Sequence, residues 1–443
     1  YIFIPYFIFL NNTIMEIQIQ NEDYDYLYKE VKQLKLFHAN HRKSICKDNK
    51  PPKSNLYGYS NKQLNKNYRI GYEQHPILKG YYETKLKHIH PEFQVVVDTI
   101  SKKYFPKDFY FNSVQINKNT NCKPHKDAGN IGYSIIIGLG DYIGGELCVE
   151  KPEDIYEINI RKKFFIFDGS KYTHWTNDFI NDRYSLIFFN NYDFDYRIAI
   201  PSYKRPDILH LKTLKYLDDC KIDFKKIDLF LKNEKELSTY HNNLNPNINI
   251  ILHEQHGIGA TRNYIQTYYY ERDNNFVISI DDDIEYLIKK DKKIYKLNHF
   301  INTCFGLTMK NNLNLFGINP CSNNFYMKDN ITTTLKYIPG GFFGWIVDKN
   351  KYLIHTTYDH LEDYQFSIET FLRDGGVLRF NNYSMITKNF AEGGISDTYG
   401  GKENRLNATE KLCNEFYNQY GSACKIVLKK DYYNIQLNHH FKG

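Results

Sequence analysis

The chain has 443 residues, of which 42% are hydrophobic and 16% aromatic. This length suits two ordinary domains with buried cores, and the composition excludes a disordered, solvating chain. The net charge of +7, from 58 Lys and Arg against 51 Asp and Glu, is mildly basic and excludes a histone-like polycation. The excess lies between Lys29 and Lys126, with about 20 basic and 7 acidic residues. That stretch fits either a nucleic-acid-binding surface or an ordinary lysine-rich surface.

The cysteines and the first residues of the chain indicate in which cellular compartment the protein is expected. The 8 cysteines form neither a CxxC pair nor a regular spacing, which argues against a disulfide scaffold and a structural zinc site. We therefore expect a reducing compartment, the cytoplasm or the nucleus, and not a secreted protein. The apolar residues 1–14 are too short to span a membrane and lack the features of a signal peptide, so we expect them outside the fold. No other segment approaches a transmembrane helix, and no membrane partner is expected.

The first half begins with helical periodicity and then changes to short strands. Helices are predicted over 22–37 and 91–104, where apolar residues recur on one face, with a polar loop over 40–70. Strands separated by Gly-containing turns are predicted over 113–117, 133–139, 146–149, 155–160, 164–167 and 183–189. Closely spaced strands without long helices between them predict an antiparallel sandwich or jelly roll.

The second half alternates strands with helices. Strands are predicted over 198–201, 227–231, 248–252 and 276–280, and helices over 207–217 and 259–270. This alternation predicts an α/β domain with a mostly parallel sheet and crossover connections. We therefore expect two domains, 15–195 and 196–443, of which residues 400–443 give no indication of their role.

Four residues of the first half have the chemistry of a non-haem iron centre. His125 and Asp127 follow the strand over 113–117, and His174 follows the strand over 164–167. Two imidazoles and one carboxylate on one face of Fe(II) leave three positions for co-substrate and oxygen. Arg183 begins the next strand, and its guanidinium can hold a carboxylate through two hydrogen bonds, as 2-oxoglutarate requires. An HxD sequence alone is a common surface turn, but the four elements together favour the iron site.

The sequence around these residues resembles a known family. Residues 115–134 contain the His-x-Asp motif and lead, through an apolar run, into Gly144-Gly145-Glu146-Leu147. Over about residues 105–190 the chain resembles the TET/JBP group of 2-oxoglutarate dioxygenases, in a form often seen in viral and algal chains. The resemblance implies a double-stranded β-helix fold and hydroxylation of the methyl group of 5-methylpyrimidine bases in nucleic acid.

The same resemblance implies roles for individual residues. It implies that His125, Asp127 and His174 hold Fe(II) and that Arg183 binds 2-oxoglutarate. Three asparagines near these residues are expected as polar contacts to the cofactors, namely Asn117, Asn119 and Asn130.

Acidic residues follow the apolar strand over 276–280 in the second half. Asp281 and Asp283 stand at the carboxyl edge of the expected parallel sheet, where ligands bind, and carboxylates two residues apart can hold Mg2+ or Mn2+ that bridges a diphosphate. The polar loop over 201–207 suits a nucleotide, and the helix that begins near residue 258 favours an anion at its N-terminus.

Downstream, Asp363 offers a carboxylate as general base for an acceptor hydroxyl, although Glu362 and Asp363 also fit an exposed helix start. This order of motifs resembles GT-A-fold glycosyltransferases, including those fused to TET/JBP dioxygenases, over about residues 197–400. The resemblance implies that Asp281 and Asp283 hold Mn2+ or Mg2+ and the diphosphate of a nucleotide-sugar donor. It also implies that Arg262 contacts the nucleotide and that Asp363 is the base, while residues 339–345 resemble the loop near donor and acceptor.

Three functions fit these features. A bifunctional enzyme that hydroxylates and then glycosylates a nucleic-acid base, DNA more than RNA, is favoured, because a hydroxylase creates the oxygen nucleophile that a glycosyltransferase can use. The same chemistry on protein, lysyl hydroxylation followed by glycosylation, is the first alternative, and the sequence over 117–134 favours the nucleobase over it. A non-catalytic nucleic-acid-binding protein with decayed sites is the second alternative, which the complete set of iron and 2-oxoglutarate residues disfavours.

Overall fold

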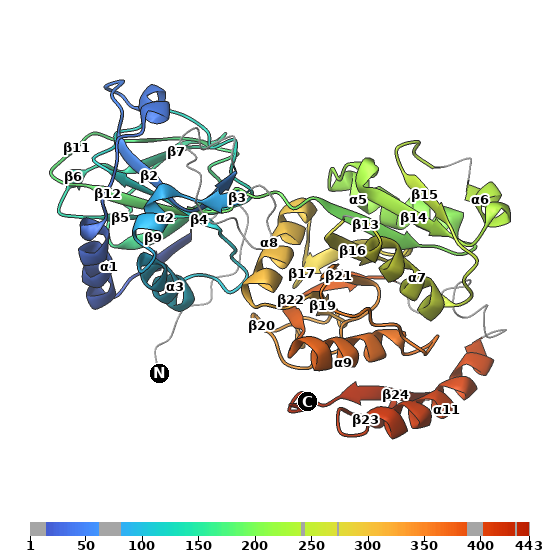
Figure 1. Cartoon of the computed structure of the whole chain (residues 1–443). Coiled ribbons are helices and arrows are strands. Elements are labelled where there is room, and N and C mark those ends of the chain that lie inside the picture. The colour runs from blue at the N-terminus through green and yellow to red at the C-terminus, as the bar shows by residue number, and fades with distance from the viewer. Residues whose placement is uncertain are drawn as a thin grey trace. The chain divides into compact units, whose positions relative to one another are not determined.

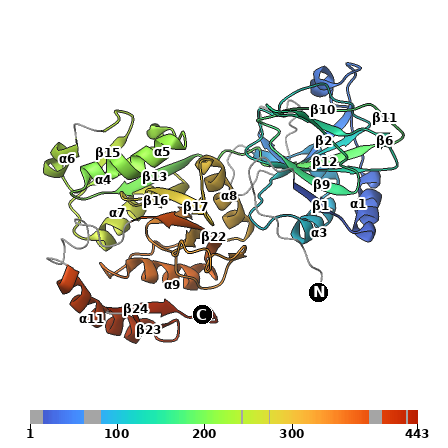
Figure 2. The same cartoon turned by 180° about the vertical axis from the view of Figure 1, so that it is seen from behind.

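The structure, a computed structural model, describes residues 15–61, 81–240, 244–272, 274–387, 402–429 and 432–442. It divides into two units, Tyr1–Asp193 and Phe194–Gly443, whereas the sequence put the boundary between residues 195 and 196. Figures 1 and 2 show the elements of each unit from opposite sides. The expectation for residues 1–14, and part of the expected loop over 40–70, fall outside the described residues. In the described part of the chain, no helix is long and apolar enough to cross a membrane.

Antiparallel sheets make up the first unit. The largest has seven strands in the order β1-β9-β5-β12-β4-β2-β3 (Figure 1). These strands are β1 (Met15–Gln18), β2 (Lys53–Asn61), β3 (Tyr81–Glu83), β4 (Ser113–Lys118), β5 (Ser134–Leu139), β9 (Lys163–Phe167) and β12 (Tyr184–Phe189). A second sheet has the order β10-β7-β8, and β11 pairs with β6. Their bounds are β6 (Ile143–Gly144), β7 (Leu147–Glu150), β8 (Ile155–Ile158), β10 (Thr173–Thr176) and β11 (Phe179–Ile180).

Alternate residues of the large sheet face two different apolar clusters. Ile137 and Phe164 belong to the cluster that includes buried side chains of the helices α1 (Asn21–Gln33), α2 (Lys85–Ile89) and α3 (Phe93–Tyr104). Ile136 and Phe165 belong to the cluster shared with β7 and β8 of the second sheet. Because side chains alternate along a strand, the large sheet is buried on both faces, which explains the continuous apolar runs of β5 and β9.

The structure confirms most expected elements of the first half and corrects one. The helices expected over 22–37 and 91–104 are α1 and α3. The loop expected over 40–70 is wrong in part, because it contains a 3-10 helix at Asn40–Ile45 and the strand β2. Strand β2 escaped prediction because polar residues dominate it, and its buried Ser54 faces other polar side chains instead of an apolar core.

The second unit contains a mixed sheet in the order β15-β14-β13-β16-β21-β19-β22-β17-β18, with β20 paired to β22. The strands are β13 (Tyr196–Pro201), β14 (Ile227–Leu231), β15 (Asn249–Leu252), β16 (Phe276–Ile280), β17 (Tyr286–Lys289), β18 (Lys292–Lys293), β19 (Leu315–Asn319), β20 (Ile331–Thr332), β21 (Phe342–Ile346) and β22 (Leu378–Ile386). The first four strands in this order are parallel, as the alternation with helices predicted. Beyond β16 the sheet is mainly antiparallel, so the expectation of a mostly parallel sheet is wrong for that half, which carries no regular strand–helix alternation.

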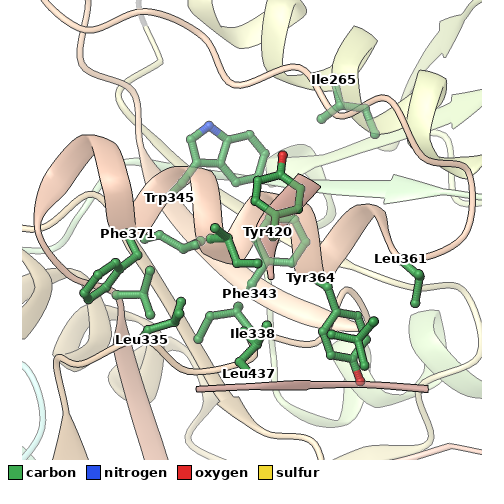
Figure 3. Packing of buried hydrophobic residues seen from close by; sticks show 14 of the residues in the cluster. Ile265, Leu335, Ile338, Phe343, Trp345, Leu361, Tyr364, Phe371, Tyr420 and Leu437 are labelled. Atoms are coloured by element: carbon green, nitrogen blue, oxygen red, sulfur yellow. The ribbon is translucent and has the colours of Figure 1, made fainter. Parts of the chain in front are cut away.

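Helices and a C-terminal hairpin complete the second unit. The expected helix over 207–217 is formed by α4 (Pro206–Leu209), a π-helical turn (His210–Leu214) and α5 (Lys215–Asp219). The others are α6 (Glu234–Tyr240), α7 (Ile258–Tyr270), α8 (Leu297–Lys310), α9 (Glu362–Asp374) and α11 (Lys402–Tyr420), followed by β23 (Cys424–Lys429) and β24 (Tyr432–Leu437). Figure 3 shows Tyr420 of α11 and Leu437 of β24 in one buried cluster with Leu335, Ile338 and Phe371. The C-terminal elements are therefore packed against α9 and the segment before β21.

Candidate active sites

His125, Asp127 and His174 converge in the first unit, with one ligand atom of each within 4.8 Å of the others. His125 and His174 form a two-residue antiparallel bridge, in which the backbone N–H of each donates to the carbonyl of the other at 3.0 and 2.9 Å. The backbone N–H of Asp127 donates to the Gly169 carbonyl at 2.9 Å. Backbone hydrogen bonds thus hold the backbone of all three residues in place, and the structure brings together the three residues that the sequence singled out at strand edges.

The hydrogen bonds of the two histidines leave one ring nitrogen of each available. The Nδ1–H of His125 donates to the Lys123 carbonyl at 2.7 Å, and that of His174 to the Tyr172 carbonyl at 3.1 Å. A carbonyl can only accept, so each ring presents an Nε2 lone pair, as metal ligation requires. These Nε2 atoms lie 3.8 and 3.5 Å from the carboxylate oxygens of Asp127.

Electrostatics agree with this donor set. Burial, together with His174, lowers the pKa of His125, which favours the neutral ring that binds a metal. Burial by itself raises the pKa of Asp127, but the adjacent rings of His174 and His125 outweigh it and bring the pKa below its usual value. Two neutral imidazoles and one carboxylate are the ligands of non-haem Fe(II) sites. Over the described ranges, no second set of three His, Cys, Asp or Glu side chains comes together in this way.

Arg183 is 3% exposed and makes no ion pair with a carboxylate of the described residues. Its Nε donates to the Gly145 carbonyl at 3.2 Å, and its guanidinium carbon lies 5.3 and 5.5 Å from the ring centres of Tyr142 and Phe179. Burial lowers its pKa. A buried cation without a counter-ion is costly, so the position suits an anionic ligand. A Cβ at Gly145 would lie 2.9 Å from Arg183, which explains a glycine there.

Asn119 and Asn130 hold site residues in place. The Asn119 side chain accepts from the backbone N–H of Arg183 at 2.8 Å. The Asn130 amide donates to Asp127 Oδ2 at 3.3 Å. Both therefore position other groups in this structure, and the direct cofactor contact expected of Asn119 stays a prediction.

Asn117 belongs to a row of polar side chains that the sequence did not reveal. Ser54 donates to Asn117 at 2.5 Å, Asn117 to Ser185 at 3.1 Å, and Gln115 to Ser54 at 3.0 Å. Arg42 of the 3-10 helix donates to Gln115 at 3.4 Å, and its buried Nε has no hydrogen-bond partner among the residues that the structure describes. The row lies on the sheet face opposite the helix-side cluster, since its members alternate with residues of that cluster. Arg42 and Ser54 fall in the segment expected as a loop, so no periodicity marked them.

In the second unit, Arg262 of α7 joins two carboxylates. Its Nη2 donates to Asp281 Oδ1 at 3.0 Å and to the Gly340 carbonyl at 3.1 Å, and its Nη1 pairs with Glu362. A Cβ at Gly340 would clash with Nη1 of Arg262, so a larger residue there would displace the guanidinium. Arg262 therefore ties α7, the end of β16 and the start of α9 together, and its expected contact with a nucleotide stays a prediction.

The three aspartates after β16 differ in accessibility. Asp282 is 5% exposed and accepts from Ser202 at 2.6 Å and from Arg205 at 3.3 Å. The side chains of Asp281 and Asp283 are 33% and 17% exposed. Burial raises the pKa of Asp281 to about 6 and that of Asp282 to about 7. Two accessible carboxylates in a crowded negative region fit a divalent cation whose remaining ligands come from a diphosphate.

Asp363 is held by three donors. Tyr337 donates its hydroxyl to Oδ2 at 2.6 Å, and the Gly340 N–H donates to the same oxygen at 3.1 Å. The Tyr364 N–H donates to Oδ1 at 3.0 Å. The residue before α9, Leu361, has φ 88°, a left-handed conformation that is strained for leucine.

The burial of Glu362 excludes an exposed helix start at α9, while the role of Asp363 as a base stays a prediction. Glu362 is 6% exposed, so the pair is not an exposed helix start. Burial and Asp363 raise the pKa of Glu362 against the influence of Arg262. Both carboxylates line a cavity of about 20 Å3, with Ser279 on its wall, which is room for one water molecule. The buried Ser279 hydroxyl finds no hydrogen-bond partner in the described part of the chain and would bind that water.

His253, directly after β15, gives a pH-dependent prediction. It is 8% exposed, and burial, with Lys232, lowers its pKa to about 4. A folded-state pKa below the unfolded value means that the stabilisation is complete above about pH 6.5 and is lost as pH falls towards 4. We expect His253→Gln to reduce the loss of unfolding free energy over this range by up to roughly 3 kcal/mol. Calorimetry against the exposed control His210→Gln measures it, and equal acid dependence in both variants would contradict the assignment.

The chain was compared with known proteins. No family model and no curated protein matches it. The solved structure of NgTET1 in complex with 5mC DNA is 13% identical at a TM-score of 0.26, covering 40% of this chain and 72% of that chain. A Pseudomonas putida prolyl-4-hydroxylase is 9% identical at a TM-score of 0.24, covering 40% of this chain and 92% of that chain.

A glycosyltransferase is also similar to part of the chain. The mannosyltransferase PcManGT from Pyrobaculum calidifontis, in complex with GDP-Man and Mn2+, is 9% identical at a TM-score of 0.36. The match covers 52% of this chain and 64% of that chain, less than two thirds of its length. Structures similar to parts of the chain thus include an oxidoreductase of the 2OG-Fe(II) oxygenase family and a mannosyltransferase. All these TM-scores are below 0.5, so the functional reasoning rests on the residues of this chain.

Proposed function

We propose that the chain is a bifunctional enzyme that hydroxylates the 5-methyl group of a pyrimidine base in nucleic acid and then glycosylates the new hydroxyl group. The observation that carries the proposal is the triad of His125, Asp127 and His174, with both Nε2 atoms available. The same unit has a buried Arg183 that pairs with no carboxylate of the described residues. The sequence resemblance to TET/JBP dioxygenases supplies the substrate class, and DNA is favoured over RNA.

In the first unit, the triad would hold Fe(II), and Arg183 would bind the distal carboxylate of 2-oxoglutarate. Bound there, Fe(II) supplies oxidation of a C–H bond by O2, with 2-oxoglutarate converted to succinate and CO2 and the second oxygen atom placed on the substrate. The fold proposed for this unit is the double-stranded β-helix. The ring centre of Phe167 lies 5.2 Å from that of His174, and the phenyl ring shields the imidazole from water. A base within a duplex must leave the stack to reach such a site.

In the second unit, Asp281 and Asp283 would hold Mn2+ or Mg2+ with the diphosphate of a nucleotide-sugar, in a GT-A-like arrangement. The cation neutralises charge on the leaving diphosphate. Asp363 would take the proton from the hydroxymethyl group as that oxygen forms the glycosidic bond. Tyr337 and the Gly340 N–H both donate to Asp363 Oδ2 and so fix its orientation.

A substrate panel tests the proposal. The full chain is incubated with Fe(II), 2-oxoglutarate and O2 together with 5-methylated DNA, unmethylated DNA, RNA or a lysine-rich peptide, and products are analysed by mass spectrometry. We expect a gain of one oxygen atom on methylated DNA, dependent on 2-oxoglutarate. Oxygen transfer to the peptide alone would identify a protein hydroxylase, and no oxygen transfer to any of the four would contradict the proposal.

Arg183→Lys should separate 2-oxoglutarate binding from iron binding. Lysine keeps the charge but loses the planar pair of donors, so we expect the KM for 2-oxoglutarate to rise roughly tenfold while iron content is unchanged. The control is Arg161→Lys, because Arg161 donates to the carbonyl of the same Tyr142 that packs on Arg183. An unchanged KM in Arg183→Lys would show that another residue binds the carboxylate.

A further inference from the structure

Three basic residues of the second unit gather around residues 335–337. Arg379 of β22 donates through Nη1 to the carbonyl of Tyr337 at 3.3 Å. The Nδ1–H of His439, which follows β24, donates to the carbonyl of Leu335 at 3.2 Å. Lys336 lies between these two carbonyls in the chain, so Lys336, Arg379 and His439 form one cationic cluster.

Among the described residues, this cationic cluster has no acidic partner. None of its members forms an ion pair with a carboxylate of the described residues, and none has a further unassigned contact there. The remaining bond of Arg379 runs from Nε to the neutral side chain of Asn381 at 2.7 Å. Its Nη2 makes no hydrogen bond within the same part of the chain. Two of the three guanidinium nitrogens of Arg379 thus donate to neutral groups, and Nη2 remains for a ligand.

The pKa values of Lys336, Arg379 and His439 are all lowered, as expected for cations without a nearby anion. Burial lowers the pKa of Arg379 to about 10. Burial and Arg379 lower the pKa of Lys336, and burial, Lys336 and Arg379 lower the pKa of His439. Like charges close together and partly withdrawn from water repel one another. An anion bound among them would remove this repulsion.

The cluster is joined to the candidate base of the transferase site. Tyr337 accepts from Arg379 through its carbonyl and donates its hydroxyl to Asp363 at 2.6 Å. Leu335 and Ile338, on either side, lie in the buried cluster with Leu437 (Figure 3). Packing therefore holds the segment and the residues after β24 in a fixed relation to Asp363.

We infer that Lys336 and Arg379, with His439 beside them, bind a backbone phosphate of the nucleic-acid acceptor. The inference rests on the proposed function, in which Asp363 receives the proton of the hydroxymethyl group. The donor diphosphate is assigned to Asp281 and Asp283. The cationic cluster is instead connected to the proposed general base Asp363 through Tyr337, which accepts from Arg379 and donates to Asp363. Arginine and lysine bind phosphate oxygens through charge-assisted hydrogen bonds. Such a contact would fix the strand while the modified base enters the site.

Kinetics on two acceptors test the inference. Sugar transfer by the full chain is measured with a hydroxymethylated oligonucleotide and with the corresponding free nucleoside, which has no phosphate. We expect Lys336→Ala to raise the KM for the oligonucleotide roughly fivefold. The slope of log KM for the oligonucleotide against log salt concentration should fall by about one. The KM for the nucleoside and both kcat values should be unchanged. Lys425→Ala, at an exposed position on β23, is the matched control. An equal effect on both acceptors, or none on the oligonucleotide, would overturn the inference.

A binding measurement keeps this test independent of the proposed function. Fluorescence anisotropy of a labelled oligonucleotide is followed with the wild type, Lys336→Ala, Arg379→Gln and Lys425→Ala, and inorganic phosphate is added as competitor. Weaker binding in the Lys336 and Arg379 variants supports the phosphate site even if no sugar is transferred to nucleic acid. Equal binding by all four proteins would overturn it. Stabilisation of the wild type by inorganic phosphate without oligonucleotide binding would assign the cluster to a free phosphate and overturn the acceptor assignment.

Discussion

Each of the variants His125→Ala, Asp127→Ala and His174→Ala should convert 2-oxoglutarate to succinate no faster than the background rate. Loss of a residue that only supports a metal ligand costs roughly 10–100-fold, and loss of one of three direct ligands should cost more. Folding should survive, because the bridge between His125 and His174 is made by backbone groups that alanine retains. Succinate formation and bound iron are measured together, and both should fall.

The matched control for these three variants is His88→Ala, an exposed histidine of the same unit. It should retain wild-type succinate formation and iron content. Near-wild-type succinate formation in any of the three triad variants would mean that another set of side chains holds the metal. Loss of succinate formation with full iron content would instead make the residue a participant in co-substrate binding.

Asp363→Asn should reduce sugar transfer by roughly 10²–10⁴-fold, the usual contribution of a general base. Asparagine preserves the shape of the side chain but cannot accept a proton, and its amide would face the donors Tyr337 and Gly340. Hydroxylation by the first unit should be unaffected, since its ligands are all in that unit. The kcat for glycosylation of a hydroxymethylated acceptor is the measurement.

Two further variants delimit this result. Asp291→Asn, at an exposed position between β17 and β18, should behave as the wild type. Tyr337→Phe removes one of the three donors to Asp363 and should have a smaller effect than Asp363→Asn. A kcat within about twofold of the wild type in Asp363→Asn would exclude it as the base, and Glu362 would then be the next residue to test.

Local sequence patterns predicted many of the strands and helices and most of the candidate iron site. Short apolar runs between Gly-containing turns located β4, β5, β9 and β12 in the first unit, and strand–helix alternation located β13 to β16 in the second. The triad could be predicted because two of its members are two residues apart, and the third follows a clear strand. Strand β2 could not be predicted, because polar residues dominate it and its buried Ser54 bonds to other polar side chains, so that Tyr57 alone of its residues belongs to the apolar cluster.

Groups that meet only through the fold were missed for a different reason. Lys336, Arg379 and His439 are far apart in the sequence, and no short motif joins them. The roles of Gly340 and Glu362 around Arg262 likewise depend on how α7, α9 and the loop before β21 come together. The antiparallel half of the second sheet pairs strands that are joined by long connections. No local sequence pattern shows in which direction the chain runs when it re-enters the sheet.

The central claim, that the product of the first unit is the acceptor of the second, is tested by mass spectrometry of nucleosides from 5-methylated DNA. The DNA is treated with His125→Ala or Asp283→Ala protein, Fe(II), 2-oxoglutarate, O2, Mn2+ and nucleotide-sugar. Asp283→Ala should accumulate the free hydroxymethyl base. His125→Ala should transfer no sugar to methylated DNA and should still glycosylate DNA supplied already hydroxylated. Sugar on unhydroxylated bases, or no transfer by His125→Ala to pre-hydroxylated DNA, would contradict the sequential scheme.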